Sequence, residues 1–228
     1  MTSLIGINFH GIGAPERDLE AGEAPYWLSA DQFQDIIGQI AASPDPSEFT
    51  ITFDDSNLSD HDIALPVLTA HGLRARFFAL TGRIGQACSL DVPHIRALSA
   101  AGMTIGSHGI DHVAWPELSD ADLERELKAS RERLEDICGH SVTEAGIPFG
   151  LYDARVLRAL KAAGYTAAWS SDGGRFQRQA YLRPRTSLRS TMTAIEIKTV
   201  LSGKITPLRR LRRAAGMARK RWTIMGTR

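Results

Sequence analysis

The stretch FTITFDDSNLSDHD, residues 49–62, begins with apolar side chains at every other position, which is the pattern of a half-buried β-strand. The pattern stops at two adjacent carboxylates, Asp54 and Asp55. Two negative charges at the end of a buried strand are costly unless a cation or another polar group lies opposite them. The stretch therefore predicts a polar partner at the end of another strand.

Similar β-like runs recur along the chain, rich in β-branched and aromatic residues and bounded by Gly, Asp or Pro. The predicted strands are residues 4–10, 49–53, 74–80, 103–108, 144–149, 165–171 and 182–188. Helical segments separate them, and a sustained alternation of strand and helix indicates a parallel sheet. About seven strands can close such a sheet into a (β/α) barrel, whose site lies at the C-terminal ends of the strands. Asp54 and Asp55 lie at such an end.

Two predicted helices carry start and stop signals. Ser29 precedes a segment with apolar residues at helical spacing, and Ser119 with Asp122 forms a capping-box pattern before a long amphipathic segment. Gly139 is the expected C-terminal stop of that second helix. The apolar stripe of each helix predicts packing in the core.

Length and composition predict one domain with a full core, since the chain has 228 residues and 43% apolar content. Neither a secretion signal nor a membrane span is expected. Cys88 and Cys138 are far apart and outside any CxxC-type spacing, which suits thiols in a reducing compartment. These features predict a cytoplasmic protein.

The net charge of +1 hides an uneven distribution. From Lys204 onward the chain carries nine Lys or Arg and no Asp or Glu, so the remainder has a net charge near −8. We predict a barrel domain at residues 1–203 and a basic tail or helix at residues 204–228. Such a helix is either solvated or packed on the barrel, or it contacts an anionic membrane surface. The acidic body argues against nucleic-acid binding. Its apolar face is predicted at Leu208, Leu211, Ala215, Ala218 and Trp222.

A second polar cluster lies at the end of another predicted strand. In IGSHGIDHVAW, residues 105–115, His108 and His112 lie four positions apart, and on a helical turn this spacing places both imidazoles on one face. Two neutral histidines and one carboxylate can bind a metal and leave a position open for water, as in hydrolytic metal centres. The second carboxylate of the pair, Asp54 or Asp55, can then act as a base. Each motif alone is weak, because surface histidines and Asp caps are common.

The chain resembles, from about residue 48 to residue 175, the polysaccharide deacetylases with a NodB-homology domain, carbohydrate esterase family 4. The resemblance is carried by ITFDD at residues 51–55, by IGSHGIDHVAW and by EAGIPFGLYD at residues 144–153. It implies a distorted (β/α) barrel and a divalent metal, most often Zn²⁺. It also implies the removal of acetyl groups from N-acetylated or O-acetylated sugars, and hence an acetylated carbohydrate as the substrate.

The resemblance also implies roles for individual residues. Asp54 matches the general base of the family, and Asp55, His108 and His112 match its metal ligands. During attack on the acetyl carbonyl, negative charge builds on the acetyl oxygen. The backbone N–H of Phe149 is the expected donor to that oxygen.

Three residues are expected to line the substrate site. Pro148 and Gly150 flank the predicted oxyanion donor, and Gly150 suits a close approach of backbone to a ligand. Trp169 resembles the aromatic residue that lines the acetyl pocket in the family. The alternatives are an ordinary turn for the first two and core packing for Trp169. Tyr26 and Trp27, in a loop near the N-terminus, are further candidates for stacking on a sugar.

The chain departs from the family pattern at two positions. Many members carry an Arg that orients the base, but here that position is Gly146. No His follows His140, so the late His that protonates a leaving amine has no match, and Arg185 on a comparable strand is a poor proton donor. Since an alkoxide leaves with less assistance than an amine, the sequence predicts a preference for acetyl esters unless another group, such as His10, donates the proton.

Three classes of function stay open. The first is a metal-dependent carbohydrate deacetylase that acts on a lipid-linked or nucleotide-linked glycan intermediate. The second is a family member that hydrolyses another non-peptide C–N bond. The third is a non-catalytic, metal-containing glycan-binding module. Retention of Asp54 beside the metal ligands weighs against the third class, because binding alone needs no base.

Overall fold

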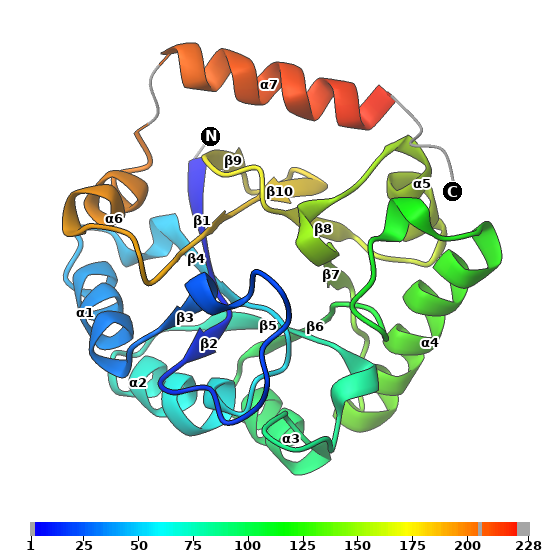
Figure 1. Ribbon diagram of the computed structural model, residues 1–228, viewed down its shortest axis with the longest axis horizontal. Coiled ribbons are helices and arrows are strands. Elements are labelled where there is room, and N and C mark those ends of the chain that lie inside the picture. Colours follow the sequence, from blue (N-terminus) through cyan, green and yellow to red (C-terminus); the bar gives the residue numbers. More distant parts are fainter. Residues whose placement is uncertain (1–2, 205–206, 223–228) are drawn as a thin grey trace.

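The computed structural model describes residues 3–204 and 207–222, and its centre is a nearly closed barrel of parallel strands surrounded by helices (Figure 1). The parallel strands are β1 Ser3–Phe9, β4 Phe49–Phe53, β5 Ala75–Ala79, β6 Thr104–Ser107, β7 Glu144–Gly146, β8 Ala167–Ser170, β10 Leu182–Pro184 and β11 Thr186–Ser187. Their order in the sheet is β10, β8, β7, β6, β5, β4, β1, β11. Each of the seven predicted runs forms a strand, and the predicted distorted (β/α) barrel is confirmed.

The barrel closes through one extended run, residues 182–187, which pairs with both ends of the sheet. Its first part, β10, pairs with β8, and its second part, β11, pairs with β1. Arg185 lies between the two parts and is fully buried. Gly6 of β1 faces this crossing, where a Cβ would lie 2.7 Å from the Pro184 carbonyl oxygen. The close approach of the two backbones therefore requires glycine at position 6.

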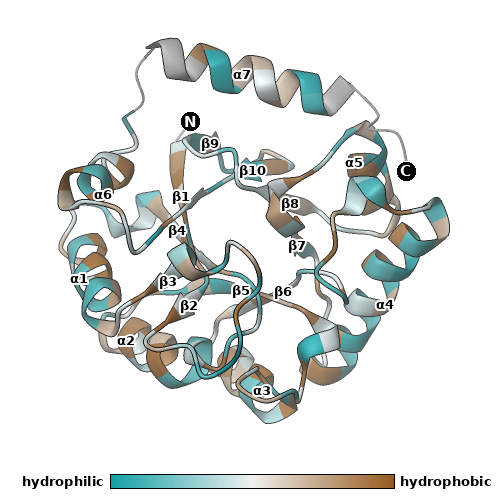
Figure 2. Ribbon diagram, viewed as in Figure 1, coloured by the Kyte–Doolittle hydropathy of each residue, from teal (hydrophilic) through white to brown (hydrophobic). Residues whose placement is uncertain are grey.

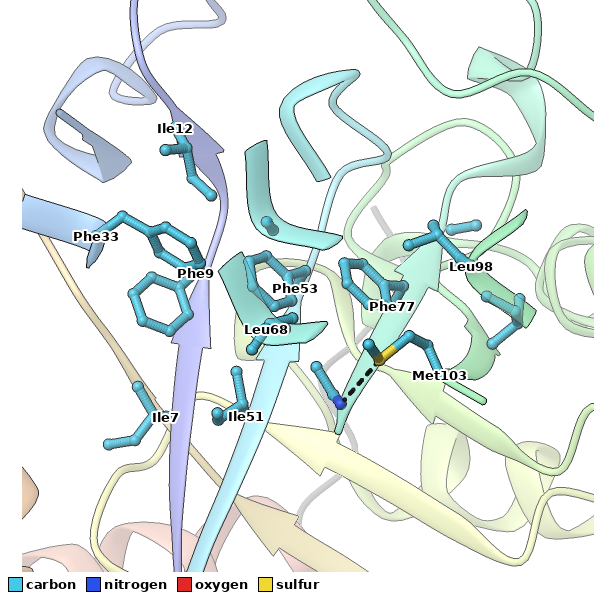
Figure 3. Close-up of a cluster of buried hydrophobic side chains, with 14 of the residues drawn as sticks. Ile7, Phe9, Ile12, Phe33, Ile51, Phe53, Leu68, Phe77, Leu98 and Met103 are labelled. Carbon is cyan, nitrogen blue, oxygen red and sulfur yellow. Dashed lines mark hydrogen bonds between the residues drawn. The ribbon is translucent and has the colours of Figure 1, made fainter. Parts of the chain in front are cut away.

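The alternation of side chains in β4 separates two environments. Phe53 points outward into the main apolar core, where its ring stacks on that of Phe77 at a centroid distance of 4.6 Å (Figure 3). Thr52 points into the barrel and donates a hydrogen bond of 2.6 Å from Oγ1 to Oδ1 of Asn8. The main core thus lies between strands and helices, and a polar network occupies this part of the barrel interior.

Seven α-helices are described, and they pack around the strands. They are α1 Ala30–Ala41, α2 Leu65–Ala70, α3 Val92–Ala100, α4 Asp120–Cys138, α5 Ala154–Ala162, α6 Ala194–Leu201 and α7 Pro207–Trp222. The predicted signals are confirmed: Ser29 closes a capping box on α1, Ser119 caps α4, and Gly139 ends α4 in the left-handed conformation at φ 72°. Figure 2 shows hydrophilic residues along the outer side of α4, as expected for a helix with one buried face.

Three short strands were not predicted. β2 Gly11–Ile12 and β3 Trp27–Leu28 form a small parallel sheet of their own, and β9 Arg175–Gln177 pairs antiparallel with β1. The long connection from β2 to β3, residues 13–26, runs in front of the barrel in Figure 1. It brings polar side chains to the strand ends where Asp54 and Asp55 lie.

The basic tail forms α7, which packs against the barrel beside α5 (Figure 1). Met217 is buried, and Lys220 donates a hydrogen bond of 2.9 Å from Nζ to Oδ1 of Asp172. The helix contacts the barrel through Met217 and Lys220, whereas the predicted apolar positions Leu211, Ala215 and Ala218 are exposed. The predicted apolar positions Leu208 and Trp222 lie outside the side chains that the structure describes.

Within the described ranges, no helix combines the length and the apolar character needed to cross a bilayer. Contact of α7 with a membrane surface stays a prediction. The same holds for the domain limits at residues 203 and 204 and for the cytoplasmic location.

Candidate metal centre and active-site cavity

Asp54 and Asp55 face the same side although they are neighbours at the end of β4. Successive residues of a strand point to opposite faces. Asp55 escapes this alternation because its backbone has turned to the left-handed region, with φ 77°. Both carboxylates are buried, at 3% exposure each.

His108 and His112 meet the Asp55 carboxylate at this end of the barrel. The Nε2 atoms of both imidazoles lie 3.4 Å from Asp55 Oδ1. The two histidines lie on a loop after β6 rather than on the helical turn that their spacing suggested. Gly109 turns this loop at φ 88°, and Glu126 accepts a hydrogen bond of 2.7 Å from the Ile110 N–H. The loop conformation, rather than a helix, therefore brings the imidazoles together.

The donor set of this cluster fits a divalent metal. One ligand atom from each of Asp55, His108 and His112 lies within 4.8 Å of the others. Each imidazole uses Nδ1 elsewhere: His108 donates to the Gly146 carbonyl oxygen and His112 to Glu20 Oε2, both at 2.9 Å. These bonds orient the Nε2 lone pairs toward Asp55, as outer partners do in metal sites. Asp55 Oδ1 is buried and has no hydrogen-bond partner among the described residues.

The charges of the cluster shift the pKa values of its members. Burial would raise the pKa of Asp55, but the close imidazole of His108 and those of His10 and His112 hold it well below its usual range. Burial lowers the pKa of both histidines. The Asp54 and Asp55 carboxylates outweigh burial at His108, whose pKa is raised, but not at His112, whose pKa is lowered. Ionised carboxylates are what a metal ion requires, and metal and protons compete for the imidazoles.

Asp54 is held by a bidentate ion pair that the sequence did not reveal. Arg185 donates from Nη1 to Asp54 Oδ1 at 2.7 Å and from Nη2 to Oδ2 at 2.9 Å. Asn8 Nδ2 donates to the same Oδ2 at 2.9 Å. Burial would raise the pKa of Asp54, but the Arg185 charge and nearby imidazoles keep it below its usual value. A carboxylate has about four lone-pair positions, so three donors leave one for another ligand.

Arg185 supplies to Asp54 the guanidinium that many members of the resembled family carry at the position of Gly146. A Cβ on Gly146 would lie 2.9 Å from Phe78 Cγ and 3.1 Å from His108 Nδ1. No larger side chain fits there without displacing those groups. The Arg185 guanidinium instead packs over the Phe78 ring, 5.1 Å from its centroid, and reaches Asp54 from the strand that closes the barrel.

Replacing Arg185 by Met leaves the Asp54 carboxylate buried without its cation, so we expect a loss of about 3–5 kcal/mol in the free energy of unfolding. Chemical denaturation measures this loss. The double variant Arg185→Met with Asp54→Asn removes the uncompensated charge and should recover part of it. A double variant that is as unstable as the sum of the single variants would show that the two residues are not coupled.

Phe149 lies at the rim of the cluster and is 55% exposed. Its ring packs on His112 at a centroid distance of 4.4 Å, and its backbone is left-handed at φ 56°. Pro148 is buried beneath it. At Gly150 a Cβ would lie 2.7 Å from Ser171 Cβ, so this glycine permits a close contact within the protein.

Backbone strain concentrates at this end of the barrel. Among the described residues, five other than glycine have positive φ, and four of them are Asp55, Ser56, His112 and Phe149. Such conformations cost on the order of 1–3 kcal/mol each and persist where the surrounding structure enforces them. Their clustering marks the strand ends as the functional side of the barrel.

One cavity of about 550 Å³ opens onto the cluster, which is a usual size for a small-molecule site. Its wall near the cluster includes His10, Glu20, Tyr26, Asp54, Asp55, His108, His112 and Phe149. The His10 ring packs on Tyr26 at 4.8 Å, and its Nδ1 is buried without a hydrogen-bond partner in the described part of the chain. Trp27 is not part of this wall.

Trp169 is the predicted site residue that the structure places elsewhere. It is 1% exposed, and its Nε1 donates to Glu144 Oε2 at 2.9 Å. Its ring lies between the guanidinium groups of Arg76 and Arg183 and contacts Phe176 edge-on. It does not line the cavity at the metal cluster. This position corresponds to the core-packing alternative and does not support a substrate contact.

Sequence reasoning missed Asn8, Glu20 and the pairing of Arg185, because their partners lie 46 to 131 positions away. It also assigned no role to a second group, in which His61, Asp62 and His94 lie close enough to hold a metal. In that group His61 Nδ1 already pairs with Asp62 at 2.7 Å. No local motif indicates any of these contacts.

Comparison with known proteins agrees with this architecture. The profile of the polysaccharide deacetylase family matches residues 41–168, more than half of the chain. The YxkH protein of Bacillus subtilis, named for the same family, is 26% identical over 172 residues, covering 72% of this chain and 61% of that protein. A chitooligosaccharide deacetylase of Rhizobium leguminosarum is 29% identical over 136 residues, covering 58% of this chain and 60% of that enzyme. The chain thus spans about three fifths of these relatives.

A solved structure shares the fold. The deacetylase PplD of Streptococcus pyogenes superimposes with a TM-score of 0.76 at 18% identity, covering 90% of this chain and 99% of PplD. The shared barrel defines the class of fold, and the profile match over more than half of the sequence shows that this chain belongs to the polysaccharide deacetylase family.

Proposed function

We propose that this protein is a metal-dependent hydrolase that removes acetyl groups from a carbohydrate. The observation that carries the proposal is the juxtaposition of an ionised Asp54, held by Arg185, with the Asp55, His108 and His112 cluster at one cavity. The relative from Rhizobium leguminosarum is named as a chitooligosaccharide deacetylase, which points in the same direction.

Each residue of the cluster has a role in this proposal. Asp55, His108 and His112 hold the metal, and the His₂–carboxylate donor set suits Zn²⁺. When bound, such a metal polarises the acetyl carbonyl and lowers the pKa of water beside it. Asp54 accepts the proton of the attacking water through its remaining lone-pair position. Arg185 and Asn8 keep the Asp54 carboxylate in one orientation while it does so.

The backbone N–H of Phe149 donates to the developing charge on the acetyl oxygen. Its left-handed conformation and its ring contact with His112 keep that N–H beside the cluster. Pro148 and Gly150 act here by fixing the turn, because Pro148 is buried and Gly150 packs on Ser171.

The proton for the leaving group comes from His10 in this proposal. His10 lines the cavity, and its charge contributes to lowering the pKa values of both Asp54 and Asp55, so it lies near the two carboxylates. Its Nδ1 is buried and has no hydrogen-bond partner among the described residues, so a proton on this ring is not already committed to a hydrogen bond through that atom. With this donor the enzyme can release an amine, and N-acetyl sugars become substrates.

Acetate release from a panel of N-acetylated and O-acetylated glycans, with and without a chelator, tests the proposed function. We expect release by the metal-loaded protein and its loss after chelation, with recovery on adding Zn²⁺. Hydrolysis of a different C–N bond, or glycan binding without any turnover, would contradict deacetylation and favour one of the two alternative classes.

Replacing His10 by Ala should lower kcat/KM by about 10²-fold or more for an N-acetyl sugar, because the amine then leaves unprotonated. The O-acetyl sugar that matches it in every other position should lose much less, since an alkoxide needs less assistance. The measurement is the ratio of the two kcat/KM values in parent and variant. If the parent already preferred the O-acetyl sugar and the His10 variant had the same ratio of kcat/KM values, His10 would be removed from the mechanism. That result would agree with the ester preference predicted from the missing late His.

A further inference from the structure

The cavity at the metal cluster continues well beyond the space that an acetyl group needs. From the cluster it passes the hydroxyl-bearing residues Thr186 and Ser187 of β11 and reaches the segment between α6 and α7. Figure 1 shows both helices on the same side of the barrel as β1 and β9. The wall of the cavity also includes Arg189, Lys204 and Arg213. Three cations therefore line the same cavity as the metal ligands.

The acidic residues of the cavity form ion pairs with cations outside its wall. Glu20 pairs with Arg83, Glu23 with Arg17, Asp54 with Arg185 and Asp172 with Lys220. The remaining acid, Asp55, belongs to the metal cluster. The cavity thus holds a cluster that suits a metal together with further cations in its wall.

Two of the cations have head groups available to a ligand. Arg189 and Lys204 are exposed, and their side chains form no hydrogen bond or ion pair with any other residue that the structure describes. Arg189 acts on the carboxylate of Glu196 only through its charge. Arg213 is half-buried and donates from Nη2 to the Arg175 carbonyl oxygen at 3.4 Å, which fixes its guanidinium above Gly174. One positioned and two exposed cations can close around an anion.

We propose that Arg189, Lys204 and Arg213 bind a phosphate group carried by the sugar whose acetyl group lies at the metal cluster. The inference rests on the proposed function and specifies its substrate as a phosphorylated, acetylated sugar. A phosphate monoester carries a charge of about −1.5 to −2 at neutral pH and offers three acceptor oxygens. Three cations lining one cavity match that charge and number of acceptors better than the single charge of a carboxylate. Arg pairs with phosphate through two N–H groups, and Lys binds it as a point charge.

Kinetics on matched substrates tests this inference. The set comprises one acetylated hexosamine, its 1-phosphate, and the same sugar linked to a nucleoside diphosphate and to a short polyprenyl phosphate. We expect the metal-loaded parent to have a kcat/KM at least about tenfold higher for one of the three phosphorylated forms than for the neutral sugar. The form with the highest value identifies the source of the phosphate. Equal or lower values for all three would overturn the proposal.

The double variant Arg189→Gln with Lys204→Gln should lower kcat/KM for that phosphorylated form by about 3- to 10-fold, through KM, and by more than for the neutral sugar. Lys198→Gln is the matched control, because Lys198 is an exposed cation of α6 that does not line the cavity. It should leave both substrates unaffected. Equal losses on phosphorylated and neutral sugars in the double variant would contradict a phosphate site.

Calorimetric titration with pyrophosphate separates this inference from the proposed function. Pyrophosphate bound at the metal alone would bind equally to the parent, the double variant and the Lys198→Gln control. Binding that is weaker by about 3-fold or more in the double variant only would support the phosphate site even if no acetylated sugar were hydrolysed. Equal binding by the three proteins would overturn it.

Discussion

Replacement of Asp54 by Asn is expected to lower turnover by about 10² to 10⁴ while leaving the metal content unchanged. Asn has nearly the same volume as Asp but accepts no proton. The metal ligands Asp55, His108 and His112 stay intact in this variant, so the loss comes from the base alone. The measurement is kcat on an acetylated glycan together with metal analysis of the same preparation.

Asp60→Asn is the matched control for this experiment. Asp60 is as deeply buried as Asp54, and burial together with the charges of Asp55 and Asp54 raises its pKa well above the usual value. Burial thus disfavours the charged form of this carboxyl, so an amide changes the local charge less here than it does at Asp54. We expect near-parental turnover for Asp60→Asn. Parental turnover in Asp54→Asn would remove Asp54 from the mechanism.

Replacement of His108 by Ala is expected to weaken metal binding by more than about 100-fold and to abolish activity with it. Loss of an outer partner of a metal ligand already costs about 10- to 100-fold in affinity, and loss of the ligand itself should cost more. His108 is fully enclosed by its neighbours, so no exposed side chain can replace its Nε2 without rearrangement. Metal content after dialysis and competition with a chelator of known affinity measure the effect.

His94→Ala distinguishes the two metal-capable groups of this chain. His94 belongs to the group with His61 and Asp62, which lies apart from the cavity. We expect His94→Ala to retain one tightly bound metal and full activity. If His108→Ala retained the tight metal and His94→Ala lost it, the metal centre would lie in the second group, and the assignment at Asp55 would be wrong.

The barrel was predictable because its signals are local. The alternation in residues 49–53, the caps at Ser29 and Ser119 and the stop at Gly139 depend only on neighbours along the chain. The alternation of strands and helices along the chain then predicts a parallel sheet. In a parallel sheet the C-terminal ends of the strands lie at the same edge. This rule predicts that Asp55 and His108 lie close together, and they do, although the helical turn expected for the histidines was wrong.

The sequence by itself thus determined the fold class and indicated Asp54, Asp55, His108 and His112 as one group of candidate site residues, because period, caps and ligand types are properties of short segments. The tertiary structure alone decided that Arg185 holds Asp54, that Glu20 orients His112, and that Trp169 lies in the packing interior. Arg185 and Asp54 are 131 positions apart and meet only because residues 182–187 close the barrel against both β8 and β1. Contacts that form when the barrel closes depend on the register of strands that are distant in sequence. No local pattern encodes that register.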